Sequence, residues 1–147
     1  MKRQIPRKLN LKKLTNKSFF ANLPRNFHAE ANSLRLKGIK SWTSLKDLKN
    51  EEINEITRSS LASSRNLKRL RCIANLICEL NVSPEDAALL MHSGIASIKA
   101  LASLTPQELL LKTGRLERLL RTGRKPVVDL KKANSWIQIA KARQITN

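Results

Sequence analysis

The chain contains the stretch ANSLRLKGIKSWTSLKDLKNEEINEIT at residues 31–57 and the stretch AALLMHSGIASIKALASLTPQELLLKT at residues 87–113. A shift of 56 residues brings the two into register without a gap, and nine positions are identical. The identical pairs are Ala31 and Ala87, Leu34 and Leu90, Gly38 and Gly94, Ile39 and Ile95, Ser41 and Ser97, Leu45 and Leu101, Leu48 and Leu104, Glu52 and Glu108, and Thr57 and Thr113. Most of these are apolar or glycine, which indicates a repeated structural unit.

Each copy is expected to form a helix, a Gly-Ile turn, a short helix and a further helix. Gly38 and Gly94 lie where the first helix must end in a left-handed residue, a conformation that glycine adopts at little cost. In the second copy, Ser83 is expected to cap the first helix, and residues 105–108 (Thr-Pro-Gln-Glu) form a capping box. No segment alternates apolar and polar residues convincingly over four to eight positions. The predicted fold is therefore all-α.

The chain divides into five predicted parts. Residues 1–22 are a disordered or extended basic arm, 23–62 the first repeat, 63–80 an amphipathic connecting helix, 81–122 the second repeat and 123–147 a basic C-terminal helical segment. The connecting helix is predicted from apolar residues at helical spacing, namely Leu67, Leu70, Ile73 or Ala74, Ile77 and Leu80.

The repeat is similar to the helix-hairpin-helix unit. The positions that carry this resemblance are Pro24, Ala31, Leu34, Gly38 and Ile39 in the first copy and Pro84, Ala87, Leu90, Gly94 and Ile95 in the second. The tandem arrangement, with Trp136-Ile137 and Ala140 near the end, resembles an uncharacterised helix-hairpin-helix-related family common in cyanobacteria. The resemblance implies sequence-independent binding of DNA, in which the backbone N–H groups of a Gly-apolar-Gly hairpin approach phosphates.

The hairpin positions depart from that pattern. They hold Arg25-Asn26-Phe27 in the first copy and Asn81-Val82-Ser83 in the second. Neither has the two glycines that permit close approach of the backbone, so cationic side chains elsewhere are expected to contact the phosphates.

The charge balance points to a polyanionic partner. The chain has 29 Lys and Arg against 11 Asp and Glu, a formal net charge of +18. A nucleic acid or an anionic surface would relieve the self-repulsion that this charge creates. We therefore expect a protein that binds the phosphate backbone of duplex DNA or structured RNA largely without sequence specificity.

Two groups of residues are the candidate contacts. The first lies in the basic stretch Lys112 to Lys132, where Thr-Gly-Arg occurs twice, and consists of Lys112, Thr113, Gly114, Arg115, Arg118, Arg121, Thr122, Gly123, Arg124 and Lys125. The second lies on the connecting helix and consists of Arg65, Lys68, Arg69 and Arg71. In Thr-Gly-Arg, exposed N–H groups, a hydroxyl and a guanidinium can converge on a phosphate. Equally, Gly114 and Gly123 can be helix C-caps whose basic neighbours complement helix dipoles.

The arginines are expected to form a ridge. Arg115, Arg118 and Arg121 would lie along one side of a helix, with Leu116, Leu119 and Leu120 on the opposite side toward the core. The five aromatic residues, Phe19, Phe20, Phe27, Trp42 and Trp136, are expected in the core rather than on a base-stacking surface.

The sequence favours neither catalysis nor a cofactor. Cys72 and Cys78 are six residues apart in a predicted helix and are expected to be free, buried thiols. His28 and His92 are isolated, so no metal site is expected. A cluster of acids, Glu51, Glu52 and Glu55, is expected to act as partners of a helix dipole. No phosphate loop or dinucleotide fingerprint is present.

The first 29 residues contain eight Lys and Arg and no acid before Glu30. A basic arm that touches phosphates and an organellar transit peptide both fit this composition, whereas a secretory signal and a membrane-spanning helix do not. We expect a cytoplasmic protein, with association with the nucleoid or ribosome open. Alternatively, the repeat docks on an acidic protein complex, or a segment with Leu9, Leu11, Leu14, Phe19 and Phe20 attaches to an anionic membrane surface.

Overall fold

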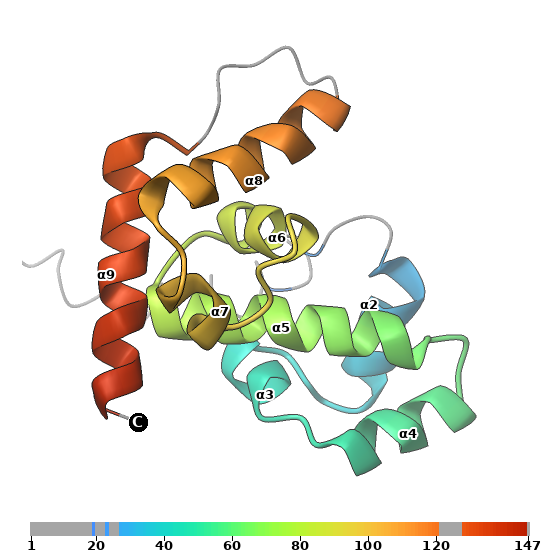
Figure 1. The fold of residues 1–147 in the computed structure, drawn as a ribbon. Coiled ribbons are helices and arrows are strands. Elements are labelled where there is room, and N and C mark those ends of the chain that lie inside the picture. The colour runs from blue at the N-terminus through green and yellow to red at the C-terminus, as the bar shows by residue number, and fades with distance from the viewer. Residues whose placement is uncertain (1–18, 20–22, 24–26, 121–127, 147) are drawn as a thin grey trace, which may run out of the picture. The chain divides into compact units, whose positions relative to one another are not determined.

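The computed structural model describes residues 19, 23, 27–120 and 128–146. These residues contain helices and no strand, which confirms the predicted all-α class (Figure 1). The chain divides into two compact units, Met1–Arg71 and Cys72–Asn147, and the boundary falls inside one long helix.

The first unit contains α2 (His28–Leu36), α3 (Trp42–Lys46), α4 (Asn50–Arg58) and the first part of α5 (Ser64–Leu80). Its buried apolar residues are Phe19, Phe27, Leu34, Trp42, Leu45, Leu48, Ile53, Ile56, Ala62, Leu67 and Leu70. The rings of Phe19 and Trp42 lie edge to face with their centroids 4.9 Å apart, an arrangement that aromatic pairs favour. A residue well before α2 is thereby part of this core.

The second unit contains the rest of α5, α6 (Pro84–His92), α7 (Ile98–Ala102), α8 (Pro106–Leu120) and α9 (Leu130–Thr146). Helix α9 packs against α7 and α8, and α6 packs against α8 (Figure 1). The buried apolar residues of the second unit are Ile73, Ala74, Leu76, Leu80, Ala87, Leu90, Ile95, Ile98, Leu101, Ala102, Leu109, Val128, Ala133, Trp136, Ile137 and Ala140. Of the apolar stripe predicted on α5, only Ile77 is half-buried rather than buried.

The helices of the two units begin at the same shift of 56 residues that relates the sequences. Helices α2 and α3 match α6 and α7 at both ends, and α4 and α8 match at their first residue. The turn after the first helix is also the same in both units. Gly38 and Gly94 have φ of 80° and 92°, and the next residue donates its N–H to a leucine carbonyl of the helix at 2.9 Å in each case. The left-handed conformation predicted for both glycines is therefore confirmed.

The helix starts are capped as their sequences indicate. The Ser83 hydroxyl accepts the N–H of Asp86 at 3.1 Å, which confirms the predicted cap of α6. The predicted capping box is also present. The N–H of Thr105 donates to the Glu108 carboxylate at 3.0 Å, and the N–H of Glu108 donates to the Thr105 hydroxyl at 3.1 Å.

The units differ after their third helix. Helix α4 ends at Arg58, and the residue 56 positions later, Gly114, lies inside α8, which continues to Leu120. Each unit then enters a helix of 17 residues, α5 or α9. The third helix of the second unit is therefore longer, and Arg115 and Arg118 lie in its added turns.

Candidate nucleic-acid interface

Three exposed cations lie along α8 at intervals of three residues: Lys112, Arg115 and Arg118. Residues three apart lie on neighbouring positions of a helix surface, so the three charges form one row. None of them makes an ion pair with another described residue. This row, which we call the α8 cation row, can therefore reach an external anion without first breaking an internal pair.

The predicted phosphate site at residues 113–115 is wrong. These residues lie in the middle of α8, where backbone N–H groups are engaged in the helix. Thr113 is 1% exposed, and its hydroxyl donates to the Leu109 carbonyl at 3.0 Å. The alternative prediction, that Gly114 ends a helix, is wrong for the same reason. The core contact of Thr113 and the helical neighbours outweigh the weak helix preference of one glycine.

The arginine ridge is present only in part. Arg115 and Arg118 lie on one helix as predicted, but Leu119, expected in the core, is 75% exposed, and Leu116 is half-buried. The last turns of α8 extend past α6 (Figure 1), so the side chain of Leu119 lacks a covering element among the described residues. The predicted contacts Arg121, Thr122, Gly123, Arg124 and Lys125 lie outside the described residues.

The second candidate group lies at the start of α5, in the first unit. Arg65 and Lys68 are exposed, and Arg69 is half-buried. Arg71 is also half-buried, and its guanidinium donates to the Leu48 carbonyl at 3.0 Å. Arg71 therefore ties α5 to the segment before α4, which corrects its prediction as a free phosphate contact. The structure places this group and the α8 cation row in different units.

The N-termini of α2, α4, α6 and α8 offer little to an anion. Acidic residues occupy the first turns of α2, α4, α6 and α8, where they complement the positive end of the helix dipole. At the hairpin before α6, Asn81 has φ of 57°, a left-handed conformation that asparagine tolerates better than most residues. Two acids, Glu85 and Asp86, follow in the first turn of α6 and repel phosphate. At these four helix starts, backbone N–H groups are therefore poor phosphate ligands.

Helix α9 carries two more lysines of the basic stretch. Lys131 is exposed. The Lys132 ammonium lies 3.6 Å from the Asp86 carboxylate and 5.6 Å from the ring centroid of Trp136, within cation–π range. Lys132 is thus occupied by contacts that attach α9 to α6.

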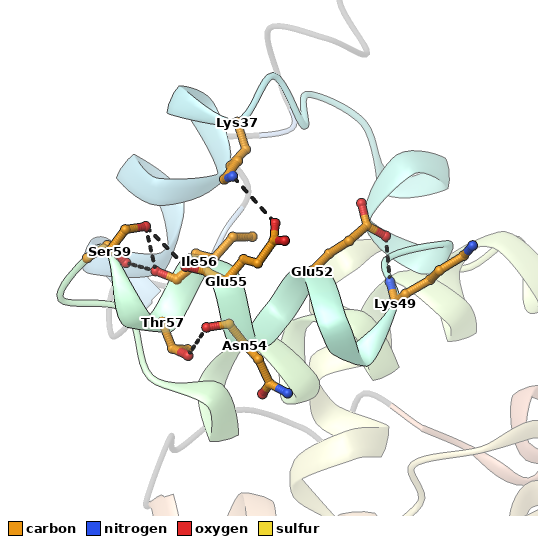
Figure 2. A network of polar contacts seen from close by, with 9 residues as sticks. Lys37, Lys49, Glu52, Asn54, Glu55, Ile56, Thr57 and Ser59 are labelled. Atoms are coloured by element: carbon orange, nitrogen blue, oxygen red, sulfur yellow. Dashed lines mark hydrogen bonds and ion pairs between the residues drawn. The ribbon is translucent and has the colours of Figure 1, made fainter.

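The acids of α4 serve their own unit (Figure 2). The Glu52 carboxylate accepts the backbone N–H of Lys49 at 3.0 Å, and Glu55 lies 3.9 Å from the Lys37 ammonium. Thr57 and Ser59 donate to carbonyls of the preceding turn. Glu52 is thus a helix-capping group and Glu55 an ion-pairing group, and Glu51 lies in the first turn of the helix.

Other candidate groups also have defined places. Phe19, Phe27, Trp42 and Trp136 are buried, as predicted, which leaves no base-stacking surface of these four rings. Because Phe19 is buried, it is not free to insert into a membrane. Cys72 and Cys78 are free but half-buried rather than buried. No group of three metal-binding side chains occurs among the described residues, and none of the described helices is long and apolar enough to cross a membrane.

The fold and its exposed side chains define a basic, all-helical protein made of two units with matching helix starts. The chain belongs to the family described as a domain of unknown function, DUF4332, which matches residues 24–143 and so includes helices from both units. The comparison with curated proteins found no match, and the comparison with solved structures found none either.

Proposed function

We propose that this protein binds the phosphate backbone of a nucleic acid through the α8 cation row, with Arg65 and Lys68 as a second contact group and no catalytic step. The observation that carries the proposal is the row itself: three exposed cations at regular spacing, none of them paired with a described residue. The net charge of +18 adds long-range attraction toward a polyanion.

The mode of binding follows from the side chains present. Arg115 and Arg118 carry guanidinium groups that can bind phosphate oxygens in a bidentate manner, and Lys112 contributes a point charge. Contacts of this kind position a duplex without reading its bases. The binding mode implied by the resemblance to helix-hairpin-helix units would use backbone N–H groups, and the acids in the first turn of α6 argue against it here.

A salt titration with duplex DNA, single-stranded DNA and structured RNA tests the proposal. If about five phosphates are neutralised, the slope of log affinity against log salt is about −4.5 on duplex DNA. No binding to any of the three at low salt would overturn the proposal. Tighter binding to the duplexes than to the single strand is expected, because no described aromatic side chain offers a stacking surface.

A charge-matched pair of variants locates the binding surface. Replacing Lys112, Arg115 and Arg118 by alanine should reduce the steepness of the slope by about 2.7, which corresponds to about 0.9 for each phosphate that is no longer neutralised. The control replaces three exposed cations of the first unit, Lys40, Lys49 and Arg58. This control variant loses the same charge, and its slope of log affinity against log salt should stay close to that of the wild type. Equal reductions in both variants would mean that net charge alone drives binding.

A further inference from the structure

An open apolar groove lies between α6 and α8 in the second unit. It has a volume of about 520 Å³ and is lined by Glu85, Ala88, Leu89, His92 and Leu116. The lining is mostly apolar, with the polar groups contributed by Glu85 and His92. Binding of a nucleic-acid backbone does not require such a surface, because phosphates interact with cations and not with leucine side chains.

The same place in the first unit is much smaller. Between α2 and α4, a hollow of about 100 Å³ is lined by Ser33, Leu36, Lys37, Ile56, Ser59 and Ser60. By the shift of 56 residues, Ser33 corresponds to Leu89 and Ser60 to Leu116. The hydroxyls of Ser33 and Ser60 donate to carbonyls of their own unit at 3.0 and 2.6 Å. The larger groove is thus lined by leucines at two positions where the first unit has serines that are hydrogen-bonded within their own unit.

The longer α8 extends the apolar surface beyond the groove. Leu119 lies three residues after Leu116, hence on a neighbouring position of the helix, and is 75% exposed. Lys112 and Arg115 each lie four residues before one of these leucines, so cations adjoin the apolar surface. An apolar groove beside a cationic edge is typical of a surface that accepts one face of an amphipathic helix.

We infer that the α6–α8 groove binds an amphipathic helical segment of an acidic partner protein. Two apolar side chains on one face of that segment would enter between Leu89 and Leu116. Its carboxylates would meet Lys112 and Arg115 on the α8 side, and its edge toward Glu85 of α6 would carry no acid. A second copy of this chain is not the occupant, because the net charge of +18 on each copy opposes self-association. An acidic segment has the complementary charge and is attracted to the same surface. The groove would share Lys112 and Arg115 with the α8 cation row, but it also depends on Leu89 and Leu116, which a phosphate backbone does not need.

The probe is a synthetic, fluorescently labelled helical peptide rich in glutamate, with leucines at positions i and i+4. Its control is a peptide of the same composition whose leucines lie on opposite faces. Fluorescence anisotropy with the full chain should show tighter binding of the first peptide by about tenfold or more, the effect of burying about one additional leucine. Equal affinity for both peptides would overturn the inference, because it would show attraction by charge alone.

Two substitutions copy the first unit into the second. Leu89→Ser and Leu116→Ser should each lower the affinity for the amphipathic peptide by about tenfold. Leu61→Ser alters a leucine of the first unit that is 95% exposed, and it should leave this affinity unchanged. Affinity for duplex DNA should stay unchanged in all three variants, which separates this inference from the proposed function. Circular dichroism and the unfolding transition show whether each variant is folded.

Amide chemical shifts give a second measurement that does not depend on substitutions. In the wild-type chain, the amphipathic peptide should move resonances of α6 and α8 around Leu89 and Leu116. Shifts confined to other helices would overturn the inference. So would sedimentation that shows self-association abolished by Leu116→Ser, because the groove would then be occupied by a second copy.

Discussion

The carboxylate of Glu30 in α2 accepts the backbone N–H of Ser63, the residue before α5, at 2.8 Å. Its other oxygen accepts the side-chain amide of Asn66 at 3.3 Å, and Glu30 is only 2% exposed. The first helix of the unit thus supplies the negative charge that the positive end of α5 favours. The counterpart in the second unit, Asp86, instead lies 3.6 Å from the ammonium of Lys132 in α9. In both units an acid at this position of the first helix holds the start of the long helix.

Removing the Glu30 carboxylate should destabilise the first unit. Glu30→Ala leaves the Ser63 N–H without its acceptor in a partly buried place, and we expect a loss of about 1–3 kcal/mol in the free energy of unfolding. Glu30→Gln keeps an acceptor but loses the charge, so it should lose less. Urea denaturation followed by circular dichroism measures both. A Glu30→Ala variant as stable as the wild type would contradict this role.

Features decided by neighbours in the sequence could be predicted. The left-handed conformations of Gly38 and Gly94, the Ser83 cap and the capping box at residues 105–108 each depend on the conformation of a few adjacent residues. The all-α class followed from the absence of segments that alternate apolar and polar residues. A left-handed conformation at Asn81 was missed, although an asparagine directly after an apolar helical stripe is a signal for it.

Features decided by packing could not be predicted. Nothing near Glu30 in the sequence shows that it meets Ser63, and nothing near Arg71 shows that it binds the Leu48 carbonyl. Thr-Gly-Arg at residues 113–115 was predicted as a phosphate site or a helix end from its composition. The sequence around it does not show that Thr113 is buried inside α8. Lys112, Arg115 and Arg118 are exposed as predicted, because their exposure follows from their spacing on a helix. The burial of Thr113 depends instead on how α8 packs in the fold.

The glycines should respond in opposite directions to alanine. Gly38→Ala and Gly94→Ala place a Cβ on a left-handed residue and should each lose roughly 1–2 kcal/mol of stability. Gly114 is helical, and a Cβ there would meet the Arg118 guanidinium at an ordinary contact distance of 3.7 Å. Gly114→Ala should therefore gain about 0.8–1.0 kcal/mol. Thermal or urea unfolding of the three variants distinguishes these cases, and a destabilised Gly114→Ala would mean that the helix does not run through this residue.

Substitutions of Arg71 and Arg65 should have different effects: the first should lower stability, and the second should weaken binding to DNA. Arg71→Ala removes the donor to the Leu48 carbonyl and should lower the free energy of unfolding by about 1–3 kcal/mol, the range for a hydrogen bond from a charged group and its unpaired partner. Arg65 is exposed, so Arg65→Ala should change stability by no more than about 0.5 kcal/mol. In the salt titration on duplex DNA, Arg65→Ala should reduce the steepness of the slope more than Arg71→Ala does. If Arg71→Ala reduced the slope without a loss of stability, the guanidinium would be a phosphate contact after all.

The capping box at the start of α8 should make stability depend on pH. The backbone N–H of Thr105, then its hydroxyl, then the charge of Lys112 hold the pKa of Glu108 below its ordinary value. A lowered pKa in the folded state means that the carboxylate is favoured there. Its contribution is complete above the pKa of the unfolded chain, about 4.3, and is lost as the pH falls through the lower folded pKa.

The stability difference between the wild type and Glu108→Gln should therefore shrink as the pH is lowered from neutral toward the acid range. Urea unfolding at a series of pH values measures it. Thr105→Ala tests the cause, because it removes the hydroxyl but keeps the backbone N–H, the larger of the two influences on the Glu108 pKa. Most of the pH dependence should survive in that variant. A difference that grows on acidification would require the Glu108 pKa to be raised in the folded protein, and the carboxylate could not then be the acceptor at this helix start.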